Sequence, residues 1–213
     1  MKIKAINIGQ PQAVPWKNKT IKTSIFKYPV NETKAVSWTN IEGDAQADLR
    51  FHGGRDKAIY AYDNASYEAW KDVLPELDWE VGIFGENLTT EGLPEQGVKI
   101  GDCFQMGSVI VKAVQPRIPC FKINVRFNRD DMLERFYNFK HYGIYFRVEQ
   151  EGQITPGDRI QKVQDSPYSI GISDAVDCFV TKGQDQALLE EILAIPILPD
   201  GIRKTFLKFR KTT

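Results

Sequence analysis

The 213-residue sequence has few cysteines, no long apolar run and no excess of charge of either sign. Its three cysteines cannot form a disulfide framework and are typical of a reducing compartment. No stretch approaches the ~20 apolar residues of a membrane helix, and the alternating N-terminus lacks the apolar core of a signal peptide. Lys plus Arg and Asp plus Glu both number 28, so the basic excess of a nucleic-acid binder is missing. We therefore expect a cytoplasmic globular protein whose partners include neither a membrane nor a nucleic-acid polymer.

Short apolar segments bounded by Gly, Pro and Asp fill most of the first 165 residues and predict strands. Helices do not alternate regularly with these segments, which favours a mainly β fold with a closed or nearly closed β-barrel over a parallel α/β sheet. Two helices are predicted among them, one from the Asp63-Asn64 cap to Pro75 and one at 130–138. The expected strands are 2–8, 24–30, 58–62, 103–106, 109–115, 143–149 and 159–164.

The sequence changes character near residue 167, where apolar residues recur at helical spacing. Three helices are predicted there: the first ends at Gly183, the second stops before Pro196, and the third is capped by Asp200. Because three short helices bury too little for a core of their own, we expect them to lean on the barrel. The predicted organisation is a barrel at 1–165 followed by a small three-helix extension at 166–213.

One candidate binding segment places His52 against Gly53-Gly54, with Arg55 and Lys57 close behind. Paired glycines let backbone N–H groups approach a ligand, and with the two cations they make a plausible anion cradle. On this segment alone, a glycine hairpin with a structural histidine is the better explanation.

A second segment, 84–92, contains Glu86-Asn87 between a glycine and a strand-like run. A carboxylate and an amide together offer acceptors and donors for the edge of a heterocycle. A purely structural turn explains this segment equally well.

The third segment presents Cys120 between two charged residues, Arg117 and Lys122, in a loop stiffened by two prolines. The charges favour the thiolate, the form of cysteine that binds metal or attacks as a nucleophile. Burial as a small hydrophobe is the alternative, and the flanking charges argue against it. Cys103 and Cys178 lie inside apolar runs with no CxxC partner, so we expect both in the core.

Together these segments resemble the MOSC domain, named for the C-terminal domain of molybdenum cofactor sulfurases, and in particular its YiiM-like branch, whose bacterial members are associated with resistance to N-hydroxylated purines. The resemblance spans about residues 1–165, and the helical tail is similar to an extension found after this domain in that branch. It rests on Gly43-Asp44 with Asp48, His52-Gly53-Gly54 with Lys57-Ala58, Phe84-Gly85-Glu86-Asn87-Leu88, Ile100-Gly101-Asp102, and Gln115-Pro116-Arg117 with Pro119-Cys120.

The resemblance implies a MOSC-type β-barrel that binds the molybdenum cofactor, a pterin dithiolene carrying a phosphate. The family's thiolate ligand to molybdenum falls on Cys120, with Arg117 and Asn87 as further catalytic residues; a soft thiolate suits a metal already held by sulfur. In protein without cofactor, a phosphate or sulfate is the expected stand-in. The phosphate donors implied are His52, the Gly53-Gly54 backbone, Lys57, Arg117 and Lys122, with Asp44, Glu86 and Asn87 toward the pterin.

The function implied is reduction of N-hydroxylated bases such as 6-N-hydroxylaminopurine, in which Mo(IV) removes the N-hydroxyl oxygen. The sequence has neither a GxGxxG fingerprint nor the cysteine spacing of an iron–sulfur cluster, so we expect a separate flavin or NAD(P)H reductase as electron donor. Two alternatives stay open: a sulfur or cofactor carrier with a persulfide on Cys120, and a binding module without redox turnover.

Overall fold

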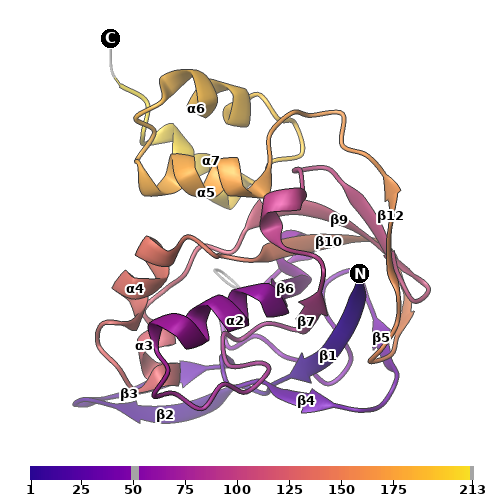
Figure 1. Cartoon of the computed structure of the whole chain (residues 1–213), viewed down its shortest axis with the longest axis vertical. Helices are drawn as coiled ribbons and strands as arrows, with labels where there is room; N and C mark the ends of the chain where they lie inside the picture. Colours follow the sequence, from indigo (N-terminus) through magenta and orange to yellow (C-terminus); the bar gives the residue numbers. More distant parts are fainter. Residues whose placement is uncertain (49–52, 212–213) are drawn as a thin grey trace.

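The computed structural model describes residues 1–48 and 53–211, and its largest element is an eight-stranded sheet in the order β12-β8-β9-β10-β6-β7-β1-β4 (Figure 1). Strands β6 and β7 are parallel neighbours, and the other neighbouring pairs in this sheet are antiparallel. Two further pairs, β2 with β3 and β5 with β11, form small separate sheets. The strands are β1 (Lys2–Ile8), β2 (Gln12–Trp16), β3 (Lys19–Thr23), β4 (Tyr28–Val30), β5 (Lys34–Val36), β6 (Ile59–Asp63), β7 (Leu88–Glu91), β8 (Cys103–Met106), β9 (Val109–Pro116), β10 (Ile144–Gln150), β11 (Gly152–Ile154) and β12 (Ile160–Gln164).

The sheet is open, with β12 and β4 at its two edges. The fold is therefore mixed α/β with one large sheet, and the predicted closed or nearly closed barrel is not confirmed. The edge strand β4 occupies only the end of the predicted strand at 24–30 and contains Pro29. Because proline has no backbone N–H to donate to a further strand, it suits an edge. A single antiparallel bridge between Lys2 and Arg159 brings β1 near the start of β12 at the opposite edge.

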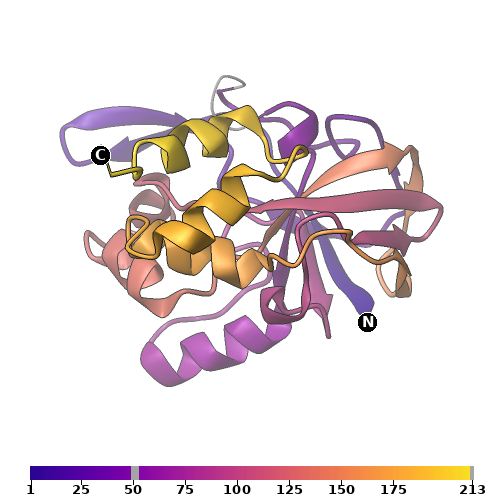
Figure 2. The same ribbon diagram turned by 90° about the horizontal axis from the view of Figure 1, so that it is seen from above.

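The helices lie in two groups (Figures 1 and 2). The first group, α2 to α4, packs around a buried aromatic cluster that includes Trp70 and Phe84, whose ring centroids are 5.8 Å apart. As predicted, α2 is capped by Asp63, whose side chain accepts a hydrogen bond from the backbone N–H of Ala65 at 3.0 Å. The helices are α2 (Asn64–Val73), α3 (Lys122–Phe127), α4 (Met132–Phe139), α5 (Ile172–Val180), α6 (Gln186–Leu193), α7 (Asp200–Leu207) and the short 3-10 helices η1 (Arg55–Lys57) and η2 (Glu95–Gly97).

The second group, α5 to α7, shares its core with the sheet. One hydrophobic cluster contains Phe104 and Phe146 from the strands together with Ile192 and Phe206 from the tail. The cap of α7 differs from the prediction: Pro199 is the N-cap, and Asp200 is the first helical residue. Cys103 and Cys178 are both buried, as expected from their apolar runs. Among the helices of the described residues, none has the length and apolar character needed to cross a membrane.

Candidate functional site

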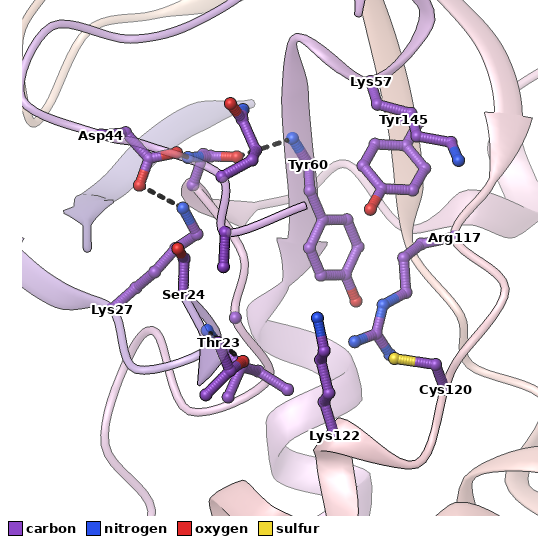
Figure 3. A pocket seen from close by; sticks show the side chains of 15 residues that line it. Thr23, Ser24, Lys27, Asp44, Lys57, Tyr60, Arg117, Cys120, Lys122 and Tyr145 are labelled. Atoms are coloured by element: carbon purple, nitrogen blue, oxygen red, sulfur yellow. Dashed lines mark hydrogen bonds and ion pairs between the residues drawn. The ribbon is translucent and has the colours of Figure 1, made fainter. Parts of the chain in front are cut away.

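A pocket of about 590 Å³, counting the space at its open mouth, lies where the loop after β9 faces the segment between β3 and β4 (Figure 3). Residues predicted from distant parts of the sequence meet there. The predicted residues that line it are Asp44, Lys57, Asn87, Arg117, Cys120 and Lys122, and the others are Thr23, Ser24, Ile25, Lys27, Gln46, Ala47, Tyr60, Gly85 and Tyr145.

Cys120 lies in the short loop that joins the end of β9 to α3, and its thiol is half-buried on the pocket wall. The loop is fixed at both ends of the cysteine. The Tyr137 hydroxyl donates to the carbonyl of Pro119 at 3.2 Å, and the backbone N–H of Ile123 donates to the carbonyl of Cys120 at 3.0 Å. The sulfur is therefore presented from a restrained backbone.

Arg117 is buried at the base of the same loop, with its guanidinium over the rings of Tyr60 and Phe136 at 5.3 and 5.5 Å from their centroids. Its backbone N–H donates to the carbonyl of Gly143 at 3.3 Å. Its Nη1 is buried and has no hydrogen-bond partner among the described residues. A buried donor without an acceptor costs free energy, so we expect a bound ligand to provide an acceptor for this nitrogen.

Two lysines complete a cationic rim around Cys120. Lys57 ends η1, and Lys122 is the first residue of α3. Burial lowers the pKa of Lys57, against the opposing influence of Asp56 and Cys120. With Arg117, these side chains place three cations on the pocket that holds the thiol, an arrangement suited to an anionic ligand.

Asp44 and Asn87 form a buried network that holds the opposite wall. Asp44 accepts hydrogen bonds from the Lys27 ammonium, from the backbone N–H of Gly9 at 2.9 Å and from Nδ2 of Asn87 at 2.9 Å. Oδ1 of Asn87 accepts from the backbone N–H of Tyr60 at 3.1 Å. Both carboxylate oxygens are thus engaged within the protein, and Asp44 positions other groups instead of offering a free acceptor.

Glu86 does not line the pocket. Its carboxylate is buried and accepts from the hydroxyls of Tyr67 and Thr89, the latter at 2.7 Å, and from the backbone N–H of Gly82 at 2.8 Å. Burial raises its pKa above the usual range, and these hydrogen bonds oppose the rise. Glu86 therefore orders the turn beneath the pocket.

The glycine pair lines a neighbouring open cavity of about 1010 Å³, between η1 and the loop that joins α6 to α7. Gly54 enters η1 with a φ of 93°, a conformation that side chains other than glycine rarely adopt. Lys57 borders both this cavity and the Cys120 pocket, so the two spaces are adjacent. His52 lies outside the described residues, and its part in a phosphate site stays a prediction.

Sequence reasoning missed Ser24, Lys27, Tyr60 and Tyr145, which all line the pocket. Ser24 and Lys27 lie within the segment 24–30, which we predicted as a strand, and its one proline, Pro29, comes after both of them. No local signal in the sequence distinguishes these four residues from ordinary strand residues.

Tyr145 lies close to the charge of Arg117. Burial raises the pKa of Tyr145, and Arg117 opposes this rise.

Comparison with known proteins gives a consistent family. The MOSC domain model matches residues 48–161. Over 204 residues the chain is 34% identical to the uncharacterized protein YflK of Bacillus subtilis, covering 96% of this chain and 92% of that protein. It is 32% identical to protein YiiM of Escherichia coli, over 77% of this chain and 70% of that one. A protein named reductase from Gibberella moniliformis is 34% identical over 70% of this chain, which spans only 27% of that protein.

Solved structures agree with the sequence relatives. The crystal structure of YiiM from Geobacillus stearothermophilus superposes with a TM-score of 0.82 at 30% identity, covering 98% of each chain. YiiM from Escherichia coli shares the fold, with a TM-score of 0.77 at 23% identity over 98% of this chain and 92% of that one. The family match begins at residue 48, so the pocket wall formed by residues 23–47 lies before it.

Proposed function

The chain belongs to the MOSC domain family, and from this membership we propose that it is a molybdenum-cofactor-dependent reductase of N-hydroxylated bases. Membership of the family and a relative that carries the name reductase support an oxidoreductase role. Beyond this role, we propose the cofactor, the class of substrate and the electron donor.

One observation carries the proposal: a restrained, half-buried thiol shares a pocket with Nη1 of Arg117, which has no hydrogen-bond partner in the part of the chain that the structure describes. These groups fit the molybdenum cofactor. A soft cysteine sulfur is a suitable ligand for a metal that is already held by dithiolene sulfurs. A buried guanidinium and two lysines provide charge-assisted donors for a phosphate.

The residues take distinct roles in this proposal. Cys120 would hold the metal, and Arg117, Lys57 and Lys122 would bind the anionic groups of the cofactor. Asn87 would orient the cofactor with the one amide N–H that Asp44 leaves available. We assign Asp44 a positioning role, because Lys27, Gly9 and Asn87 already engage its oxygens.

When bound, the cofactor supplies the two electrons that cleave the N–O bond. The reaction balances as R–NHOH + 2H⁺ + 2e⁻ → R–NH₂ + H₂O. The electrons would return from a separate flavin or NAD(P)H reductase, the partner that this function requires.

The proposal is tested by turnover of 6-N-hydroxylaminopurine, with a chemical reductant in place of the partner. Protein from a cofactor-proficient host should form 6-aminopurine, and Cys120→Ala protein from the same host should not. Wild-type protein with stoichiometric molybdenum that leaves the substrate unchanged would contradict the proposal.

A further inference from the structure

The segment between β3 and β4 forms the pocket wall across from Cys120. Thr23 ends β3, Lys27 immediately precedes β4, and Figure 3 shows both together with Ser24 on the side away from Cys120 and Arg117. This wall precedes the part of the chain that matches the family model. The similarity to YflK extends over 96% of this chain, so the start of the family model at residue 48 does not set this wall apart from the rest of the fold.

Two polar side chains on this wall have hydrogen-bonding capacity that the described residues do not use, and Ser24 is the first. Its Oγ is buried and makes no hydrogen bond within the described part of the chain. The neighbouring Thr23 differs, because its Oγ1 accepts from the backbone N–H of Ile25 at 3.1 Å. A buried hydroxyl that has no hydrogen-bond partner among the described residues is suited to bind a ligand.

Lys27 is the second such group. Its side chain is 8% exposed, and its ammonium donates to Asp44, its partner among residues 1–48 and 53–211. An ammonium carries three N–H donors, so the ion pair leaves donor capacity unused. The backbone N–H of Gly9 and the amide of Asn87 hold Asp44 in place, and Asp44 in turn fixes the ammonium on the pocket wall.

We propose that Ser24 and Lys27 recognise the substrate, donating hydrogen bonds to ring-nitrogen or carbonyl acceptors of an N-hydroxylated heterocycle while its N–O group is turned toward Cys120. This inference rests on the proposed function and adds the residues that select the substrate. Ile25 and Ala47 line the same pocket and provide apolar contact for a flat ring. A substrate without ring acceptors gains nothing from the two donors.

The test compares binding of two compounds to cofactor-loaded protein by calorimetry: 6-N-hydroxylaminopurine, which has ring acceptors, and N-phenylhydroxylamine, which has none. Ser24→Ala should weaken purine binding about tenfold, the worth of one hydrogen bond, and leave N-phenylhydroxylamine unaffected. Because the hydroxyl makes no hydrogen bond to residues 1–48 or 53–211, the same variant should keep the wild-type melting temperature. Lys27→Met should weaken purine binding further, with Lys22→Met on exposed β3 as the matched control.

The outcomes separate this inference from the proposed function. Unchanged purine binding in Ser24→Ala, or loss of molybdenum from that variant, would overturn the inference, the latter because the wall would then serve the cofactor. Wild-type protein that reduces N-phenylhydroxylamine but does not prefer the purine would overturn it while the reductase function stands. Wild-type protein that binds the purine through Ser24 without reducing it would support the recognition wall and contradict the reductase.

Discussion

At the scale of single residues, the guanidinium of Arg117 joins the protein core to the pocket. Two aromatic rings support it, and Nη1 is left without an acceptor in the described structure. Charge-assisted hydrogen bonds to such a group contribute about 1.5–3 kcal/mol. The affinity of the pocket for a phosphate or sulfate should therefore depend strongly on this side chain.

Replacing Arg117 with Met should lower phosphate affinity about 10- to 100-fold, measured by calorimetry on protein without cofactor. Arg117→Lys keeps the charge but loses the planar fork, and an intermediate affinity is expected. Equal phosphate binding by all three proteins would show that the anion site lies elsewhere.

Glu95 gives a pH-dependent prediction. Its carboxylate accepts from the backbone N–H of Tyr142 at 3.0 Å, and burial raises its pKa to about 6. A carboxyl group whose pKa is raised by folding binds more protons in the folded state, so its favourable contribution is full below the unfolded pKa and is lost as pH rises through the folded one. The contribution should fall by up to about 2 kcal/mol between pH 4.5 and 6.5.

Glu95→Gln removes this titration, so the difference in unfolding free energy between wild type and variant should change with pH across that window. His141, whose side chain lies 3.7 Å from Glu95, and Asp63 also face this site and are retained in both proteins. Urea denaturation at several pH values measures the difference. A difference that is constant with pH would contradict the raised pKa.

At the scale of elements, Gly143 links the start of β10 to the loop that carries Arg117. Its φ is 71°, and an added Cβ would lie 2.5 Å from the carbonyl oxygen of Ala61. Gly143→Ala should lower the unfolding free energy by roughly 1–3 kcal/mol or more and weaken phosphate binding. Gly97→Ala is the control, because Gly97 has no positive φ and open space at its Cβ. Equal stability of the two variants would contradict this reading of the turn.

The spacing of apolar residues in the sequence predicted the strands and helices that pack against the core. The strands Lys2–Ile8 and Cys103–Met106 have the predicted bounds, and most of their apolar residues are buried. The hairpin of β2 and β3 was not predicted, because its residues are mostly exposed and it is held by pairing between its two strands. Helix α3 was missed because six residues are too few to show a helical period.

In the candidate site, too, local features could be predicted from the sequence and contacts between distant segments could not. The rigid loop around Cys120 and Arg117 was visible in the sequence, since prolines and charges mark it locally. The engagement of Asp44 by Lys27 was not, because it joins residues from separate segments through a buried ion pair. Closure of the sheet is equally non-local: it depends on whether the edge strands β4 and β12 pair, which neither segment reveals alone.

At the scale of the whole molecule, the sheet and the helical tail should unfold together, because one hydrophobic cluster spans both. Phe206 in α7 is fully buried, and its replacement by Ala should cost about 3–5 kcal/mol. All four tryptophans precede residue 80, so their fluorescence reports on the first part of the chain. Phe206→Ala should shift that fluorescence transition in urea, and Leu207→Ala, at an exposed neighbour, should not. An unshifted transition in Phe206→Ala would mean that the tail folds separately.

The central claim, that the pocket around Cys120 holds the molybdenum cofactor, is tested most directly by elemental mass spectrometry. Wild-type and Cys120→Ala proteins would be produced side by side in a cofactor-proficient host, and their molybdenum content measured per chain. Near-stoichiometric molybdenum in the wild type and its loss in the variant, with an unchanged melting temperature, is the predicted result. Absence of molybdenum from both proteins after reconstitution with the cofactor would contradict the claim and favour a sulfur carrier or binding module.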